Sequence, residues 1–282
     1  MTQGSFSDAA LVVFGHGSTL NSQSGAPVFQ HVAELRRRKC FADVQESFWK
    51  QEPVLIDVLR SLNASKVFLV PLFISEGYFS EKIIPQALGF GDLTQEQFPR
   101  VQRHGAQTLF YCRPVGTHPT MTEVLLARAR EVTKRFPFPR SPIPKDITLF
   151  IAGHGTEQEE NSRASIDRQV ELIRLRRIYG GVHGVFLEEE PRISACYQLA
   201  QSKNIVVVPF FISEGMHTQE DIPILLGEPE RVVQQRLQNG QPAWRNPSEK
   251  QGKLVWYASS VGGEPLMADV IIERVQEAAT WV

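Results

Sequence analysis

Cysteine is scarce in this sequence, with three residues, Cys40, Cys112 and Cys196, among 282. They lie far apart, form no C-x-x-C pair, and their odd number leaves one thiol unpaired in any disulfide scheme. A disulfide framework is therefore excluded, and the pattern favours a reducing compartment. We expect the three side chains to be buried as small apolar groups.

Long apolar runs are also absent. No uninterrupted stretch approaches the ~20 apolar residues that a membrane span needs. The opening residues, MTQGSFSDAALVVF, place no basic region before the apolar stretch, which argues against a secretory signal. The sequence thus predicts a cytoplasmic protein without a membrane partner.

The chain has no excess of charge of either sign, because 30 Lys and Arg stand against 31 Asp and Glu. A general basic excess is what attracts a phosphate backbone, so nucleic acid is not expected as a partner. The densest basic stretch, residues 36–39, is expected to be a solvated helix face. What the chain does have is 42% hydrophobic residues over a length that suits two domains of about 140 residues each.

The sequence repeats itself. The motif Gly-His-Gly around His16 returns around His154. The segment Val-Pro-Leu-Phe-Ile-Ser-Glu-Gly, which ends two positions before Phe79, returns as Val-Pro-Phe-Phe-Ile-Ser-Glu-Gly, which ends two positions before His217. Both pairs lie 138 positions apart. Two further pairs keep this spacing: Phe48-x-x-x-Glu52-Pro53 with Phe186-x-x-x-Glu190-Pro191, and Ile84-Pro85 with Ile222-Pro223. We infer an internal duplication.

Later landmarks, at Tyr111 and Tyr257, are 146 positions apart, so the second copy holds eight extra residues between 224 and 256. The polar stretch 238–248 within it is predicted to be an exposed loop. Between the copies lie closely spaced prolines that favour an extended spacer. We therefore predict a first repeat at 8–135, a linker at 136–145 and a second repeat at 146–282.

Each copy alternates short apolar runs with amphipathic stretches. The runs are β-branched and aromatic, and their near-continuous apolarity is typical of parallel strands that are buried on both faces. The alternation predicts an α/β fold: two similar tandem doubly wound domains, each with a mainly parallel sheet flanked by helices. The strands are expected at 11–14, 66–74, 147–151, 182–187 and 205–212, and the helices at 162–178 and 191–201.

Candidate functional residues follow the strands of the second copy. His154 follows the strand 147–151, His217 follows the strand 205–212, and Glu188 follows the stretch 182–187. Ligands of open parallel sheets bind beyond the carboxyl ends of the strands. Two histidines and a carboxylate are suitable ligands for a borderline divalent metal.

Duplication supplies an internal control. His16 is the counterpart of His154, but the positions of His217, Glu188 and Asp221 hold other residue types in the first copy, namely Phe79, Lys50 and Ile83. A phenyl ring and a cation cannot replace metal ligands. We infer that the second copy carries the chemistry and that the first is a structural or substrate-gripping half.

Plainer interpretations exist for each residue. A single His after a strand is often a hydrogen-bonded turn residue, and the acidic run Glu188, Glu189 and Glu190 could be a solvated turn or a helix start. Any of these three carboxylates could be the partner of the histidines. Asp221 could cap a helix or could support His217. Glu76 and Glu214 occupy matching positions in the two copies, which favours a shared structural role.

These motifs together resemble the class II tetrapyrrole chelatases, and more narrowly sirohydrochlorin chelatases of the CbiX/SirB type. The resemblance covers residues 10–135 and 146–280. Its most specific part is Val-Pro-Phe-Phe-Ile-x-x-Gly-x-His-x-x-x-Asp-Ile-Pro at 208–223. Two-copy members of the group often keep the functional histidines in the amino-terminal half, whereas the full set here is carboxy-terminal.

The resemblance implies an enzyme that inserts cobalt or iron into sirohydrochlorin without ATP, in a cleft between two similar halves, for cobalamin or siroheme biosynthesis. The metal would be substrate, and no prosthetic group is expected. His154 and His217 would bind the metal and accept pyrrole protons, with Glu188 as their carboxylate partner. Neutral imidazole, with a pKa near ~6.5, can do either at neutral pH. Residues that could hold substrate carboxylates are Arg113, His118 and Arg163.

Two other functions compete with this one. A carrier with a chelatase-like fold would bind a tetrapyrrole or metal without turnover. A phosphate-transferring enzyme with His154 as nucleophile is disfavoured, because Gly153 stands where an Arg should precede the His. Since two fused copies already supply paired halves, the protein could be a monomer or a homodimer.

Overall fold

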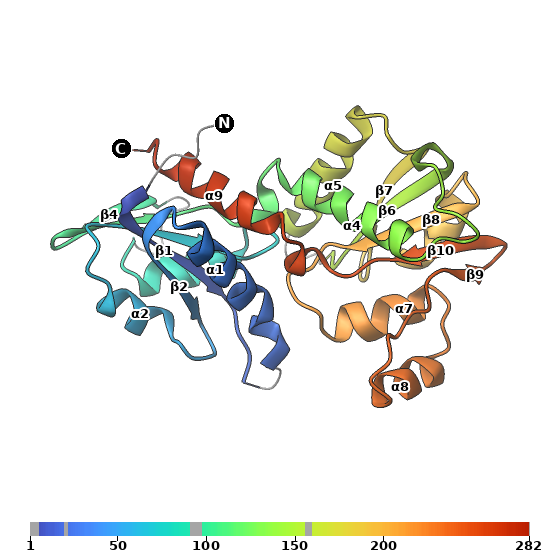
Figure 1. Cartoon of the computed structure of the whole chain (residues 1–282), viewed down its shortest axis with the longest axis horizontal. Coiled ribbons are helices and arrows are strands. Elements are labelled where there is room, and N and C mark those ends of the chain that lie inside the picture. The colour runs from blue at the N-terminus through green and yellow to red at the C-terminus, as the bar shows by residue number, and fades with distance from the viewer. Residues whose placement is uncertain (1–5, 20–21, 91–97, 156–159, 282) are drawn as a thin grey trace. The chain divides into compact units, whose positions relative to one another are not determined.

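The computed structural model describes residues 6–19, 22–90, 98–155 and 160–281 (Figure 1). The chain divides into two compact units. Unit 1 comprises Met1–His118 together with Pro265–Val282, and unit 2 comprises Pro119–Glu264. Unit 2 is thus continuous in sequence, whereas unit 1 is assembled from both ends of the chain.

Unit 1 contains a five-stranded sheet of order β2-β1-β3-β5-β4, parallel except for the edge strand β4. Helices α1 and α9 pack together beside β1, β2 and β3, while α2 and α3 contribute to the apolar core on the other face. The strands are β1 (Phe6–Gly15), β2 (Phe41–Phe48), β3 (Lys66–Pro71), β4 (Val101–His104) and β5 (Gln107–Tyr111). The helices are α1 (Ala26–Arg38), α2 (Leu55–Ser61), α3 (Ile84–Ala87) and α9 (Met267–Ala278).

Unit 2 has the same architecture, with a sheet of order β7-β6-β8-β10-β9 and an antiparallel edge strand β9. The strands are β6 (Ile147–Gly153), β7 (Gly181–Phe186), β8 (Asn204–Pro209), β9 (Ser248–Lys250) and β10 (Lys253–Tyr257). The helices are α4 (Met121–Arg135), α5 (Glu160–Leu175), α6 (Cys196–Leu199), α7 (Ile222–Leu225) and α8 (Glu230–Gln238). Two mainly parallel sheets with flanking helices confirm the predicted α/β class.

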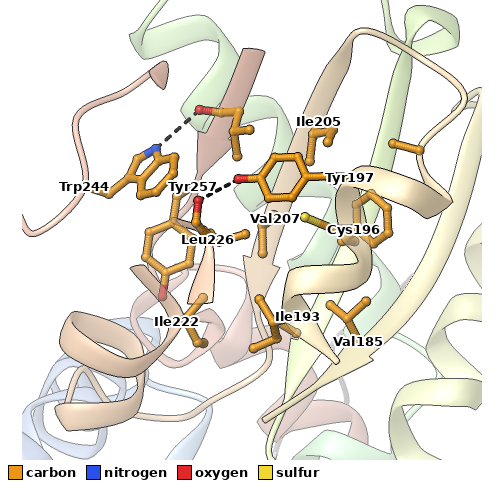
Figure 2. Packing of buried hydrophobic residues seen from close by; sticks show 14 residues of the cluster. Val185, Ile193, Cys196, Tyr197, Ile205, Val207, Ile222, Leu226, Trp244 and Tyr257 are labelled. Carbon is orange, nitrogen blue, oxygen red and sulfur yellow. Dashed lines mark hydrogen bonds between the residues drawn. The ribbon is translucent and has the colours of Figure 1, made fainter. Parts of the chain in front are cut away.

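Parallel strands buried on both faces explain the apolar runs of the sequence. In unit 2, Phe150 of β6 and Val207 of β8 face Ile193, Tyr197 and the remaining residues of one core cluster (Figure 2). Two of its polar side-chain atoms are satisfied within the cluster: the Tyr197 hydroxyl donates to the Leu226 carbonyl at 2.6 Å, and Trp244 Nε1 donates to the Val255 carbonyl at 3.3 Å. The Tyr257 hydroxyl donates to the Thr218 carbonyl outside it, at 2.6 Å. The helices on this face therefore hold the loops that follow the strands.

The last helix of each repeat packs on the sheet of the other repeat. Helix α4, from the first repeat, lies against β8 and β10, and α9, from the second, lies against β3 (Figure 1). A buried arginine fixes each helix: Arg128 Nε donates to the Ser260 carbonyl at 2.9 Å, and Arg274 Nε donates to the Pro114 carbonyl at 3.0 Å. The two arginines are counterparts at the 146-residue spacing, so the exchange is reciprocal.

The compact units consequently differ from the contiguous repeats of residues 8–135 and 146–282. The proline-rich segment 136–145 belongs to unit 2, where it connects α4 with β6. Trp256 Nε1 donates to the Phe136 carbonyl at 2.8 Å, and Ser141 Oγ donates to the Thr133 carbonyl at 2.9 Å. The physical reason is that α4 has already packed on the second sheet, so that its connection to β6 stays within one unit.

Some local expectations need correction. The helix predicted over 191–201 is only a 3-10 turn (Ile193–Ala195) followed by α6. The loop 238–248 is not exposed throughout, because Trp244 and Ala243 are buried in unit 2. Cys112 and Cys196 are buried as expected, while Cys40 is half-buried. In the described part of the chain, none of the helices has the length and apolarity needed to cross a membrane.

Gly262 allows the loop after β10 to touch the loop after β8. A Cβ at this position would lie 1.6 Å from the Ile212 carbonyl oxygen, which is backbone and cannot rotate away. We expect Gly262→Ala to lower the free energy of unfolding by about 1–3 kcal/mol or more, through overpacking. Urea denaturation measures this, with Gly215→Ala as control, since a Cβ there meets nothing within 4 Å. Equal stability of the two variants would contradict the close approach.

His118 lies in unit 1 near the buried Arg274. Burial, and secondarily the guanidinium of Arg274, lower the pKa of His118 to about 4. Because the folded-state pKa is below the unfolded value of ~6.5, the neutral ring favours folding, and this contribution is lost as pH falls from about 6.5 through 4. We expect the His118 ring signal to titrate near pH 4 by NMR, assigned by its loss in His118→Gln. A midpoint near 6.5 would contradict this environment.

Candidate functional site

The predicted site residues lie on three loops at one edge of the unit 2 sheet. His154 directly follows β6, Glu188 comes two residues after β7, and His217 lies beyond β8. Strands β7 and β8 both pair with β6 in parallel, so their carboxyl ends meet at the same edge. The topology therefore brings together residues that are up to 63 positions apart in sequence.

Close packing fixes the loop that holds His154. Gly155 has a φ of +63°, and a Cβ there would lie 2.7 Å from Cβ of Phe186, so only glycine fits. The Leu187 N–H donates to the Gly153 carbonyl at 3.0 Å, and the Glu188 N–H donates to the His154 carbonyl at 3.1 Å. These contacts place the side chains of His154 and Glu188 next to each other.

The two imidazoles are in contact. Their ring centroids lie 4.8 Å apart and their planes cross at 81°, an edge-to-face arrangement. His154 Nε2 lies 3.8 Å from Glu188 Oε1, beyond hydrogen-bond distance. Two ligand atoms that share a metal with bonds of about 2.1 Å are roughly 3–4 Å apart. The spacing of these atoms thus fits a shared cation.

Asp221 orients His217. Its Oδ2 lies 2.6 Å from His217 Nδ1, and both residues belong to a single π-helical turn, His217–Asp221, of the kind that is frequent at functional sites. Asp221 precedes α7 but makes no side-chain cap hydrogen bond. Of the two roles considered for Asp221, the structure shows the contact with His217. It leaves Nε2 as the nitrogen of His217 that is available to a ligand.

His154 differs from His217 in the hydrogen bonding of its Nδ1 atom. The Nδ1 atom of His154 is buried and has no hydrogen-bond partner among the residues that the structure describes. About a third of its side chain, 32%, is exposed. The ring therefore offers Nε2, on the Glu188 side, but nothing in the described chain fixes its tautomer.

The structure separates the three glutamates of the acidic run. Glu189 Oε2 accepts from Arg163 Nη1 at 2.9 Å, and Glu190 Oε2 accepts from the Arg192 N–H at 3.0 Å. Glu188 is the one that faces His154, and 56% of its side chain is exposed. Glu188 is thus the member of the run placed beside the histidines.

Arg163 is engaged within the protein. Besides Glu189, it donates to the Glu190 carbonyl at 2.9 Å, and its guanidinium lies 4.9 Å from the centre of the Phe186 ring. It holds the loop after β7 in place. The other two candidates for substrate carboxylates, Arg113 and His118, belong to unit 1, where Arg113 Nη1 lies 3.4 Å from Glu277 Oε1. Thr156, which directly follows the second Gly-His-Gly motif, lies outside the described residues.

The residues that the structure describes include no group of three His, Cys, Asp or Glu side chains already arranged to hold a metal ion. Two imidazoles and a nearby carboxylate are present, and all three side chains are partly open to solvent. Such an open arrangement suits a transient ligand set better than a permanent structural site.

The first repeat keeps the ring geometry but holds other residue types at the positions of His217, Glu188 and Asp221. His16 and Phe79 have ring centroids 4.8 Å apart at 70°, so the phenyl group occupies the place of the second imidazole. Trp49 and Phe73 pack edge-on against Phe79. Burial and the nearby Lys50 ammonium lower the pKa of His16. The same π-helical turn, Phe79–Ile83, is present without any carboxylate partner.

Two of these features have no signal in the sequence. No residue pattern marked the π-helical turn, and the link from Glu214 was assigned only to a generic shared role. Glu214 Oε1 accepts from the Ser260 N–H at 2.7 Å, which ties the loop after β8 to the residue whose carbonyl binds Arg128. The matching spacing of Arg128 and Arg274 was the available clue.

Comparisons with known proteins point to one family. A probable sirohydrochlorin cobaltochelatase of Halobacterium salinarum is 39% identical over 97% of this chain and 92% of its own length. A sirohydrochlorin cobaltochelatase of Methanopyrus kandleri is 29% identical and matches 47% of this chain with 96% of its length, as a relative of one-repeat size would.

Among solved structures, a multi-domain protein of Deinococcus radiodurans with structural similarity to chelatases superposes with a TM-score of 0.77 at 28% identity. The match covers 96% of this chain and 54% of that one. The family model described as CbiX matches residues 10–132 and again residues 148–278, once for each repeat. The chain therefore belongs to the CbiX family.

Proposed function

We propose that this protein inserts a divalent metal, cobalt or iron, into sirohydrochlorin without ATP, as a step of cobalamin or siroheme biosynthesis. The observation that supports it is the contact of His154 and His217, 4.8 Å apart, beside Glu188 in a chain of the CbiX family. Relatives named sirohydrochlorin cobaltochelatase support the substrate. The metal is a substrate of this reaction.

The first task of the site is to receive the metal. His154 Nε2, His217 Nε2 and the Glu188 carboxylate offer two nitrogen donors and one oxygen donor, a set that borderline divalent cations accept. Three protein ligands leave coordination positions for water and then for the nitrogens of the macrocycle. The second repeat is the half assigned to this task.

The second task is to take up protons, because metallation removes two N–H protons from the macrocycle. His217 can accept one of them at Nε2 once the metal has left that nitrogen, and the Asp221 carboxylate at Nδ1 would stabilise the imidazolium that forms. Glu188 and His154 are the nearest further acceptors. A water-exposed site lets these protons pass on to solvent.

The asymmetry between the histidines favours release of the metal. When Nε2 of a neutral imidazole binds a metal, the ring proton must sit on Nδ1, and in His154 that atom is buried without an acceptor in the described structure. An unsatisfied buried donor costs about 1–3 kcal/mol. His154 is thus a weakened ligand, whereas Asp221 strengthens His217. Transfer to the macrocycle would begin with loss of the His154 bond.

Four finer points stay predictions. Binding of the macrocycle between the two repeats is inferred from the duplication, and the cytoplasmic location from the cysteine pattern. The choice between monomer and homodimer is open, because fusion of two copies is compatible with both. The donor set is compatible with either cobalt or iron.

Replacement of His217 by the first-repeat residue tests the reaction. We expect His217→Phe and His154→Ala each to slow metallation of sirohydrochlorin by Co²⁺ by about 100-fold or more, because each removes a donor and a proton acceptor. His16→Ala, the matched change in the first repeat, should keep the wild-type rate. The visible absorption of the macrocycle, followed under anaerobic conditions, measures this.

The same assay separates the alternatives. Catalytic turnover that is lost in the second-repeat variants supports the proposal. A spectral change limited to one equivalent of protein would instead identify a carrier. Absence of any change with Co²⁺, Fe²⁺ or Ni²⁺ would rule out sirohydrochlorin as the substrate.

The role of Asp221 has its own test. Asp221→Ile, which copies Ile83, should weaken Co²⁺ binding by about 10–100-fold, as loss of a carboxylate behind a metal-binding imidazole commonly does. Calorimetry measures the affinity, and ¹⁵N NMR of the His217 ring should show that the Nδ1-protonated tautomer is no longer dominant. Glu220→Gln, one position away, serves as control. Unchanged affinity and tautomer in Asp221→Ile would refute the role.

A further inference from the structure

A cavity lies at the edge of the unit 2 sheet opposite to the histidines, at the amino ends of the strands. It has a volume of about 440 Å³, within the range of small-ligand pockets, and is bordered by Thr148 at the start of β6 and Gly181 at the start of β7. Its charged lining residues are all cationic: Lys145, Arg174 and Arg177. His183 completes the polar wall, and no carboxylate is among the residues that line the cavity.

Basic residues at this place have a simple structural explanation, which the first repeat allows us to separate. Cations favour the carboxyl end of a helix, and α1 ends in Arg36, Arg37 and Arg38 as α5 ends near Arg174. Arg36 Nε donates to the Val44 carbonyl and Arg174 Nε to the Val182 carbonyl, both at 2.8 Å. These shared features are structural and indicate no ligand.

What differs is the neutralisation of the cations. In the first repeat, Arg36 lies 2.8 Å from Glu46, and Arg37 and Arg38 both pair with Glu34. The counterparts of Glu34, Asp43 and Glu46 in the second repeat carry no charge: they are Leu172, Gly181 and Gly184. Each acidic residue is replaced by an apolar residue or by glycine.

Among the paired cations of the first repeat, Arg36 is the one whose counterpart keeps its charge and loses its partner: Arg174 stands opposite Gly184 instead of a glutamate. Leu175 replaces Arg37, and Arg176, the counterpart of Arg38, pairs with Glu123. Neither Arg174 nor Arg177 forms an ion pair within the described part of the chain, and the nearest acidic residue on the same helix is Glu171, one turn earlier. Arg174 uses only Nε for the Val182 carbonyl, so its terminal nitrogens remain available. Lys145 Nζ donates to the Arg177 carbonyl, which leaves two of its three hydrogens.

Space and charge thus coincide in unit 2. Gly181, which lines the cavity, stands where the first repeat has Asp43, and the imidazole of His183 stacks on Phe150 at 5.4 Å, which holds it in the cavity wall. Burial, and secondarily Arg174, lower the pKa of His183, so that this ring adds hydrogen-bonding groups rather than charge.

We propose that this cavity binds a small organic anion through phosphate or carboxylate groups, held by the guanidinium groups of Arg174 and Arg177 and by Lys145. Planar guanidinium matches both groups in bidentate fashion. The site is separate from the histidines, because it lies at the amino ends of the strands that have His154 and His217 at their carboxyl side. It does not depend on the proposed metal insertion.

The chain offers a matched pair of variants. Arg177 has a φ of 51° and its counterpart Lys39 a φ of 53°, both exposed residues in the left-handed region, where asparagine is well tolerated. Arg177→Asn and Lys39→Asn hence remove one positive charge each at equivalent backbone positions. They differ only in whether the lost cation lines the cavity.

Calorimetric titrations with inorganic pyrophosphate and with citrate, at constant ionic strength, test the proposal. We expect saturable binding of at least one probe to the intact protein, weakened about tenfold or more by Arg177→Asn and unchanged by Lys39→Asn. Preference for pyrophosphate assigns a phosphate ligand, and preference for citrate a polycarboxylate. Absence of saturable binding by both, or equal weakening in the two variants, would overturn the site.

Discussion

Close packing of backbone at the carboxyl ends of the parallel strands is the constraint on which the site depends. Gly155 fits against Phe186 only because it lacks a side chain, and Gly262 does the same against Ile212. These approaches bring three loops within reach of one another, so that His154 and His217 can touch although neither is held by a regular helix or strand. The chemistry follows from this packing, because an imidazole displaced by a single side chain would lose its partner.

Duplication shows which parts of this packing are scaffold and which are chemistry. The glycine at φ +69° after β1, the π-helical turn and the 4.8 Å ring contact all recur in the first repeat, where the second ring is Phe79. An aromatic cluster and a pair of touching imidazoles are thus alternative contents of the same backbone. The scaffold does not require the histidines, and it accepts whichever aromatic ring the sequence supplies.

The sequence predicted the class of fold, the repeat and the residues that meet at the sheet edge, because strand periodicity and the carboxyl-end rule are strong local signals. It left Glu188, Glu189 and Glu190 equivalent, since only tertiary contacts assign Glu189 to Arg163 and turn Glu190 toward Arg192. It likewise missed the exchange of α4 and α9. The periodicity of an amphipathic helix indicates that one face packs on a sheet. It does not indicate on which of two similar sheets that face packs.

The exchange of α4 and α9 also determines which of the two units can be completed first during synthesis of the chain. Unit 2 is one continuous segment, Pro119–Glu264, so every element of it has been synthesised once residue 264 has left the ribosome. Unit 1 begins first, yet its sheet is not fully covered until α9, which follows unit 2 in the sequence, has emerged. The contacts of α9 with β3 join residues some 200 positions apart, and such long-range contacts form slowly. The half without the complete histidine pair therefore cannot be completed before unit 2 has been synthesised, and the face of β3 that α9 covers stays open until then.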